Sequence, residues 1–170
     1  MVSIWQCGAP RRLVFSGLLT ALCGCVTPLV EAQSAGAQAQ APVQAIVLER
    51  TCFGCPGAMR LVLRNDGTAL LTQIGNARRG TEDKTSRGTL PKAEFDKLAQ
   101  LALAQGFYAM QDRYQNGNDQ DGEWIVITLT RGTTDKQVMR REDAGPLALK
   151  AIEAAIDAVK DRTTFTPDRP

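Results

Sequence analysis

Hydrophobic and polar residues alternate along several short segments of the chain, which is the pattern of β-strands with one buried face. The alternation predicts strands over residues 44–50, 59–64 and 68–74. Residues 65–67 read Asn-Asp-Gly, which is typical of the tight turn in a β-hairpin. A weaker pattern predicts a fourth strand over residues 85–90. The first half of the chain therefore predicts a run of antiparallel strands.

A second hairpin is predicted in the C-terminal half of the chain. Two alternating segments, residues 124–131 and 136–141, flank a Gly-Thr turn at residues 132–133. An acidic, glycine-rich segment at residues 116–123 precedes this hairpin, and its composition predicts a solvated loop.

Apolar residues recur at helical spacing in two further segments. The first predicted helix covers residues 91–105, with Pro91 at its first position and Gly106 as its stop. The second opens at residues 145–146. The apolar stripes that we expect to face the sheet are Phe95, Leu98, Leu101 and Ala102 in the first helix, and Leu149, Ile152, Ile156 and Val159 in the second.

Hairpin strands with two separate helices predict an α+β fold. We expect a mostly antiparallel sheet of about five to six strands, packed against the two helices. The strands and helices fall within residues 44–162, which predicts a single domain there. Residues 163–170 show no periodic pattern, so the sequence predicts a disordered tail.

The N-terminal region has the layout of an export signal. Arg11 and Arg12 precede an apolar run at residues 13–22, and small residues follow it. That run is shorter than the roughly 20 residues that span a bilayer comfortably. We therefore expect residues 1–32 to be a signal peptide, and residues 33–43, rich in Ala, Gln and Gly, to be a flexible linker.

Two ways of processing this signal stay open. Cleavage after residues 30–32 would release a soluble periplasmic protein, and the sequence favours this alternative slightly. Residues 22–25 also resemble a bacterial lipobox, in which Cys25 would be the lipidated residue. The protein would then be an outer-membrane lipoprotein, tethered to the membrane through Cys25.

Composition removes several classes of function. The chain has no histidine, so neither a Ser-His-Asp nor a Cys-His catalytic arrangement can form. The net charge is +2, and basic residues occur singly or in pairs, which gives no support to nucleic-acid binding. No pair of carboxylates is spaced for glycoside hydrolysis, and no glycine-rich segment fits a nucleotide fingerprint.

Cys52 and Cys55 are the cysteines that remain once the predicted signal is removed. Two thiols so close in an exported protein tend to oxidise, so we expect a disulfide. Closing so short a loop contributes roughly 2 kcal/mol, enough for a local clamp on the turn. The alternative is a redox-active pair, which ordinarily stands at the start of a helix, whereas here a strand pattern resumes at Met59.

Metals and cofactors find no support in the sequence. A structural zinc site needs a second pair of sulfur or imidazole ligands, which the mature chain lacks. Laid on the EF-hand calcium loop, the acidic segment places Gly117 at the first ligand position and Thr128 at the last, and neither fits. We therefore predict neither a metal nor a cofactor.

The motif Arg-Thr-Cys-Phe-Gly-Cys-Pro at residues 50–56 resembles that of a bacterial family, domain of unknown function 6438. The resemblance continues through Phe107, Asp112 and Tyr114 to Asp121, just before the strand at residues 124–131. It implies export and a disulfide, and it implies no reaction.

These observations favour a non-enzymatic binding or interaction module in the periplasm, with a structural disulfide. The candidate interaction residues are Phe53, beside the cysteines, and Asp112, Tyr114 and Asp121. The alternative is a thiol-disulfide exchange protein that uses Cys52 and Cys55. A weaker hypothesis is carboxylate-based hydrolysis around Asp112 and Asp121. The sequence identifies no partner and no oligomeric state.

Overall fold

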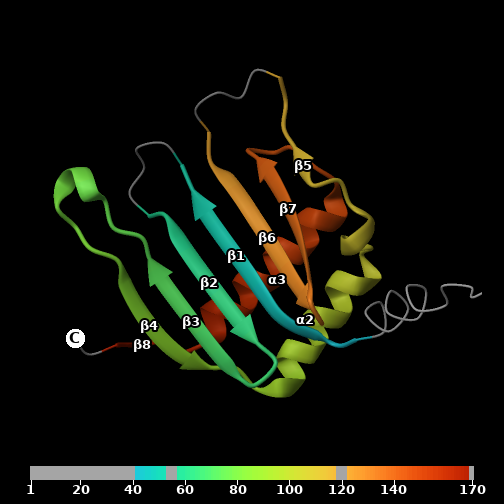
Figure 1. Ribbon diagram of the computed structural model, residues 1–170, viewed down its shortest axis with the longest axis horizontal. Coiled ribbons are helices and arrows are strands. Elements are labelled where there is room, and N and C mark those ends of the chain that lie inside the picture. Colours follow the sequence, from blue (N-terminus) through green and yellow to red (C-terminus); the bar gives the residue numbers. More distant parts are fainter. Residues whose placement is uncertain (1–40, 53–56, 118–121, 169–170) are drawn as a thin grey trace, which may run out of the picture.

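A computed structural model describes residues 41–52, 57–117 and 122–168. They form two layers, an eight-stranded sheet and a pair of α-helices that cover one of its faces (Figure 1). The predicted signal peptide, including Cys25, lies outside the described residues. Of the predicted linker, only the last residues are described, and Val43 already belongs to the first strand.

The strands follow the order β5-β7-β6-β1-β2-β3-β4-β8 across the sheet. Their neighbours pair antiparallel, except for β5 and β7, which pair parallel. The strands are β1 (Val43–Thr51), β2 (Met59–Arg64), β3 (Thr68–Gln73), β4 (Lys84–Thr89), β5 (Arg113–Tyr114), β6 (Trp124–Arg131), β7 (Thr134–Arg141) and β8 (Thr166–Pro167).

Both α-helices begin directly after a proline. Pro91 precedes α2 (Lys92–Ala104), and Pro146 precedes α3 (Leu147–Arg162). Proline's fixed φ suits a helix start, and its missing N–H costs nothing there. Two short 3-10 helices, η1 (Ala77–Arg79) and η2 (Phe107–Ala109), complete the helical elements of the described residues. None of these helices is long and apolar enough to cross a membrane.

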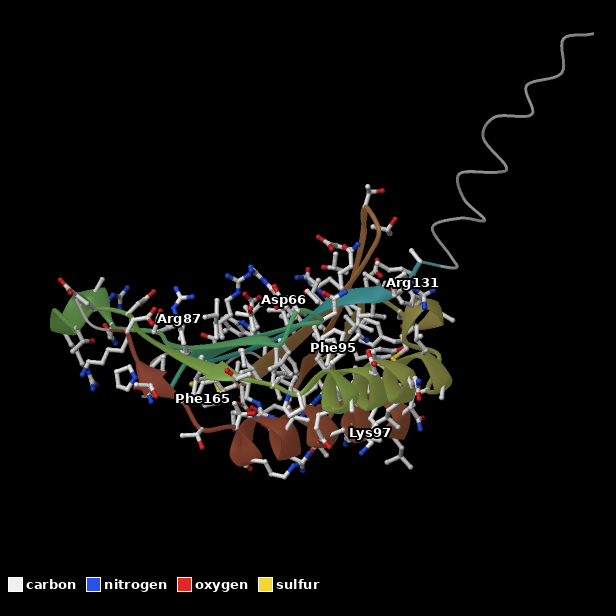
Figure 2. All side chains as sticks on the ribbon, turned by 90° about the horizontal axis from the view of Figure 1, so that it is seen from below. Asp66, Arg87, Phe95, Lys97, Arg131 and Phe165 are labelled. Atoms are coloured by element: carbon white, nitrogen blue, oxygen red, sulfur yellow. The ribbon has the colours of Figure 1, made fainter. Side chains whose placement is uncertain are left out.

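The core lies between the sheet and the two helices. Strand alternation places Ile46 and Leu48 of β1 on the helix side, opposite Leu63 and Leu61 of β2. The buried side of α3 is the stripe predicted from its sequence. Viewed from the side, charged residues such as Arg87 rise from the other face of the sheet, away from the helices (Figure 2). One face of the sheet is thus covered and the other is open.

The α+β class, the mainly antiparallel sheet and the two helices are confirmed. The predicted number of five to six strands is wrong, because the sheet has eight in the described residues. The additional strands, β5 and β8, have two residues each. Alternation needs four or more residues to show in a sequence. Each of these strands forms where its segment of the chain lies beside an edge strand of the sheet and pairs with it.

The C-terminal segment is ordered up to Asp168, contrary to the predicted tail. Thr166 and Pro167 pair with β4, and the Asp168 carboxylate binds the Arg87 Nε at 2.8 Å. Phe165 packs against the core. These contacts are made with distant residues, so the local sequence gives no sign of them.

We expect Gly88→Ala to destabilise the protein by about 1–3 kcal/mol, the cost of overpacking a close contact. A Cβ at Gly88 would lie 2.7 Å from the Thr163 Cγ2 and 2.9 Å from the Thr164 carbonyl oxygen. The matched control is Gly117→Ala, which meets nothing within 4 Å. Urea unfolding of both variants measures the difference. Equal midpoints would show that the segment does not lie against β4.

Candidate functional site

The structure separates the predicted site residues into two groups. Phe53, Cys55 and Asp121 lie outside the described residues. Cys52 is described and follows β1 directly. Asp112 and Tyr114 lie at β5, and two strands, β7 and β6, separate β5 from β1. Cys52 and the β5 residues therefore do not share a site.

Asp112 and Tyr114 make local contacts at the edge of the sheet. The Asp112 side chain is 85% exposed and pairs with the Lys136 ammonium. The Tyr114 hydroxyl accepts a hydrogen bond from the Gln111 N–H at 3.0 Å, and its ring packs against the core. Among the described residues, no cluster of acidic or sulfur side chains could hold a metal ion. The hydrolysis hypothesis receives no support at Asp112.

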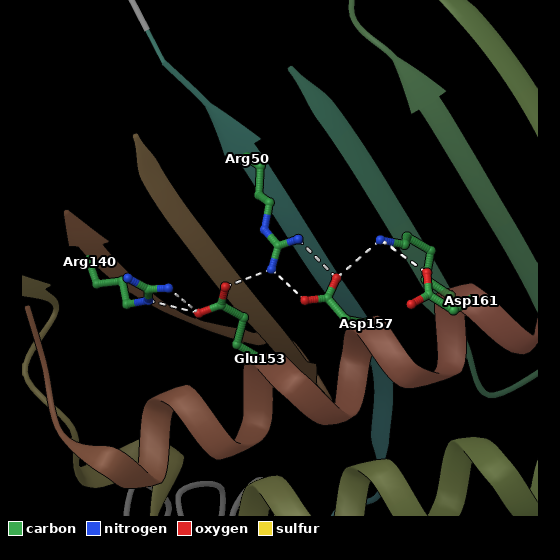
Figure 3. A network of polar contacts seen from close by, with 6 residues as sticks. Arg50, Arg140, Glu153, Asp157 and Asp161 are labelled. Carbon is green, nitrogen blue, oxygen red and sulfur yellow. Dashed lines mark hydrogen bonds and ion pairs between the residues drawn. The ribbon is translucent and has the colours of Figure 1, made fainter. Parts of the chain in front are cut away.

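A network of ion pairs joins the sheet to α3 (Figure 3). The Arg50 guanidinium donates to the Asp157 carboxylate at 2.9 and 2.5 Å, and to Glu153 Oε1 at 2.6 Å. The other Glu153 oxygen accepts from the Arg140 Nε at 2.7 Å. Lys160 extends the network, because its Nζ lies 3.2 Å from Asp157 Oδ1. Glu153 is only 7% exposed, so its charge depends on these partners.

The alternation of β1 explains why Arg50 points into the molecule. Arg50 follows Ile46 and Leu48 at two-residue intervals, so all three share the helix side of the sheet. In the same way, Arg140 follows the buried Val138 in β7. On α3, the partners recur at three- and four-residue spacing beside the apolar stripe, as Glu153, Asp157 and Lys160.

Arg50 keeps its charge in this position. Burial by itself lowers the pKa of Arg50, but the hydrogen bonds and charges of Asp157 and Glu153 outweigh burial and raise it above its ordinary value. The Arg50 Nε is buried and has no hydrogen-bond partner in the described part of the chain. Two of its three nitrogens thus carry the anchoring contacts.

A pocket of about 830 Å³ opens beside Cys52, at the end of the sheet where β1 stops and β2 starts. We call it the Cys52 pocket. Its lining combines the end of β1, the start of β2, the end of β3, the loop after β3 and one residue of α3. The described lining residues are Thr51, Cys52, Gly57, Ala58, Met59, Leu71, Gln73, Ile74, Gly75, Asn76, Arg79, Thr81 and Lys160.

Hydrogen bonds hold the loop after β3 in a fixed shape. The Asp83 carboxylate accepts from the Gly75 N–H at 2.8 Å, and the Thr81 hydroxyl accepts from the Asn76 N–H at 2.7 Å. The Asn76 side chain caps η1, which carries Arg79 at its end. Gly75 is required here, since a Cβ would lie 2.2 Å from the Thr81 carbonyl oxygen. The loop therefore forms an ordered wall.

The described lining carries two cations and no carboxylate. Arg79 comes from η1, and no carboxylate of the described residues lies within ion-pair distance of it. Lys160 comes from α3, held by Asp157 and, at 3.4 Å, by Asp161. The apolar part of the lining is Met59, Leu71 and Ile74, and Ile74 is 43% exposed. Such a pocket suits a ligand that is apolar with an anionic group.

Another pocket, of about 650 Å³, lies where the chain leaves α3. Its charged residues already pair with carboxylates. Arg162 lies 2.9 Å from Glu94, and Arg87 lies 2.8 Å from Asp168. A ligand anion would have to compete with these carboxylates, so this pocket is the weaker candidate.

Five residues of these sites were not predicted from the sequence: Arg50, Arg140, Glu153, Arg79 and Lys160. A signal existed for two of them, because Arg50 and Arg140 occupy inward positions of alternating strands. The sequence contains no such signal for Arg79 or Lys160, because they line one pocket only after the whole fold has placed the loop after β3 beside the end of α3.

Comparison with models of protein families gives a match over residues 44–160, to the family described as Domain of unknown function (DUF6438). No curated protein and no solved structure matches the chain.

We expect Glu153→Gln to destabilise the protein by about 3 kcal/mol, the range for breaking a buried ion pair. The substitution keeps the side-chain shape and leaves Arg50 and Arg140 without one of their counter-charges. The control is Asp161→Asn, whose carboxylate is 71% exposed and should contribute less than about 1 kcal/mol. Urea unfolding distinguishes the two variants, and similar losses would contradict the anchoring role.

Proposed function

The chain belongs to the DUF6438 family, whose description names no activity, and from the Cys52 pocket we propose a function for it. The protein is an exported, non-enzymatic binding module, and its pocket takes a small amphipathic anion. The observation that carries this proposal is the lining itself, with Arg79 and Lys160 beside apolar side chains and no carboxylate among the described residues.

The size and chemistry of the pocket support ligand binding. Small-molecule sites range over about 300–1,000 Å³ and combine apolar walls with a few polar groups. The Cys52 pocket falls within this range at about 830 Å³. A ligand that covers Ile74 removes apolar surface from water, which contributes about 25 cal/mol for each Å². An anionic group would meet Arg79 without displacing a carboxylate.

Nothing in the described lining favours a catalytic mechanism. General acid–base work needs a titratable group within hydrogen-bond reach of the reacting atoms. Besides Cys52, which is treated below, the described titratable groups of the lining are Arg79 and Lys160, and Lys160 is held by two carboxylates. Binding is therefore the simpler use of this pocket.

The proposed disulfide between Cys52 and Cys55 would clamp the turn that borders the pocket. Cys52 lines the pocket, and β2 begins at Met59, four residues after Cys55. A redox-active pair ordinarily stands at the start of a helix, which lowers a thiol pKa. A strand at Met59 supports the structural role over thiol-disulfide exchange. Export rests on the predicted signal peptide, with lipidation of Cys25 as the tethered alternative.

We expect the protein to bind decanoate and to bind decyltrimethylammonium at least about tenfold more weakly, a difference of about 1.4 kcal/mol. The two probes share a ten-carbon chain and differ in the sign of the head group. Isothermal titration calorimetry measures both affinities. Equal affinities would show that charge plays no part in this pocket.

We expect Arg79→Glu to weaken decanoate binding about tenfold or more, because it replaces an attractive charge by a repulsive one. The control is Arg78→Glu, which makes the same charge change one residue away, at a side chain outside the pocket lining. Calorimetry of both variants provides the comparison. Equal losses would reduce the effect to net charge and contradict the proposed site.

We expect the reduction potential of the cysteine pair to lie below about −300 mV, the range of structural disulfides. Equilibration of the exported protein with thiol buffers, followed by thiol labelling, measures it. A potential well above this value, with fast exchange against a thiol substrate, would overturn the structural role and support a thiol-disulfide exchange protein.

A further inference from the structure

We propose that the open face of the sheet binds an amphipathic helix of a partner protein, one that carries acidic residues beside its apolar side. This inference goes beyond the proposed function and concerns the other face of the sheet. The Cys52 pocket lies on the covered face, because Met59 and Leu71, which line it, pack against the core. The basis of the inference is a stripe of apolar side chains with arginines around it.

Each of five neighbouring strands contributes one apolar side chain to this stripe. From β7 to β3 its members are Met139, Val126, Val47, Val62 and Leu70. All five are partly buried, and none of them is among the residues that pack against the core. Their positions alternate with those of residues facing the helices, which places them on the open face. We call this set the open stripe.

Strand register makes the open stripe continuous. Met139 lies directly opposite Val126. Val62 lies directly opposite Val47 on one side and Leu70 on the other. Val126 and Val47 are diagonal neighbours, because Val126 pairs two residues after Val47 on β1. The side chains therefore form one unbroken apolar surface across the sheet.

Arginines surround the open stripe. The neighbours of the stripe are the residues two positions away on each strand and the residue opposite it at each end. Five of these neighbours are arginines and one is a carboxylate. The arginines are Arg60, Arg64, Arg87, Arg113 and Arg141, and the carboxylate is Glu49. A partner on this face thus meets mainly positive charge.

Two of these arginines already have a carboxylate. Arg60 pairs with Glu49 at 2.9 Å, and Arg87 pairs with Asp168 at 2.8 Å. Both pairs are exposed, and exposed pairs contribute little free energy. These two arginines are therefore not the ones that select a partner.

Arg64 and Arg113 carry charge that is not paired in this way. Neither has a carboxylate of the described residues within ion-pair distance. Asp66, two residues after Arg64, uses its carboxylate to accept from the Thr68 N–H at 2.8 Å. Arg113 stands at one end of the open stripe, and Arg64 stands beside Val62. Carboxylates that border the apolar side of a partner can pair with both.

The width and repeat of the open stripe fit a helix. It is one side chain wide, so a second sheet packed on it would also cover the polar residues on both sides. Its side chains recur at the strand spacing, about 4.8 Å. Along one side of an α-helix, residues recur every three or four positions, about 4.5–6 Å. Side chains on one face of an extended chain recur only about every 6.6 Å, so a helix matches better.

The length of the surface fits a helix of ordinary size. From Arg113 to Arg87 it crosses six strand spacings, which amount to about 29 Å. At about 1.5 Å per residue, a helix of about 19 residues covers this distance.

The side-chain types around the open stripe favour a protein partner over a membrane surface. Arginine, methionine and aromatic residues are enriched where proteins bind each other, and lysine is depleted. The neighbours of the stripe include no lysine, and Trp124 stands beside Val126 with the Arg141 Cζ 5.4 Å from its ring centroid. The valines are short and lie between long arginine side chains, so a helix reaches them better than a flat lipid surface.

The test uses two labelled helical peptides. One consists of three repeats of Glu-Leu-Glu-Ala-Leu-Leu-Glu, and its twin has Lys in place of every Glu. Both carry the same apolar side. We expect the acidic peptide to bind the exported protein at least about tenfold more tightly than the basic one, because its charges complement those of the face. Fluorescence anisotropy measures both affinities. Equal affinities, or a preference for the basic peptide, would overturn the proposal.

A charge variant locates the bound peptide. Arg113→Glu should weaken binding of the acidic peptide about tenfold, because it places a negative charge at the end of the open stripe. The control is Lys97→Glu, the same charge change at an exposed residue of α2, on the other side of the molecule from Arg87 (Figure 2). If Lys97→Glu weakened binding as much, the peptide would respond to net charge and not to this face.

An apolar variant tests the stripe itself. Val62→Thr keeps the shape of the side chain and suits a strand, and it should weaken peptide binding about threefold. The control is Ile74→Thr, a similar change in the Cys52 pocket, which should leave peptide binding as it was. Unchanged binding by Val62→Thr would contradict the helix on the stripe.

Two further measurements address other occupants of the open face. Analytical ultracentrifugation should show a monomer, and a dimer that Arg113→Glu dissociates would assign the face to a second copy of the chain. Vesicles of phosphatidylglycerol should show no binding that depends on Arg113. Such binding, without binding of the acidic peptide, would assign the face to a membrane. Either result would overturn the proposal and leave the Cys52 pocket untouched.

Discussion

The packing of α3 on the sheet depends on how one partly buried arginine is held between them. Arg50 leaves β1 toward the core and is neutralised by Glu153 and Asp157 of α3. Removing one partner would leave an uncompensated charge away from water, whereas apolar residues in place of the whole cluster could pack as stably. The contribution specific to the ion pairs is orientation. They join Glu153 and Asp157 of α3 to β1 and β7, and Lys160, three residues after Asp157, lies on the same side of the helix.

The candidate site is a consequence of incomplete cover on the helix side of the sheet. The two α-helices bury the inward residues of the central strands, but β3 and β4 continue past them (Figure 1). Only short elements border this uncovered part of the sheet. They are the end of α3, the loop after β3 and the two-residue strand β8. These elements bring charged side chains around an apolar floor. The surface between these elements is therefore hollow, whereas a longer helix would have covered it and extended the core.

The sequence predicted the elements in which hydrophobic residues recur at strand or helix spacing. It did not predict the elements that form through contacts with residues distant in the sequence. Alternation gave the long strands, and the stripe from Leu149 to Val159 gave the buried side of α3. β8 and the order of the last residues come from pairing with β4, which local sequence does not encode. The site shows the same division. The sequence singled out Cys52, which lines the pocket, whereas Arg79 and Lys160 come to line it only through the complete fold.

Amide chemical-shift mapping with decanoate tests the central claim, that an amphipathic anion binds in the Cys52 pocket, most directly. Two-dimensional ¹H–¹⁵N spectra of the labelled protein, recorded through a titration, locate the bound probe. We expect the largest shifts at the amides of Met59, Leu71, Ile74, Gly75 and Arg79, which line the pocket. Shifts concentrated instead at Gly88, Thr89, Thr163 and Thr164, around the pocket beside the end of α3, would contradict the assignment of the site.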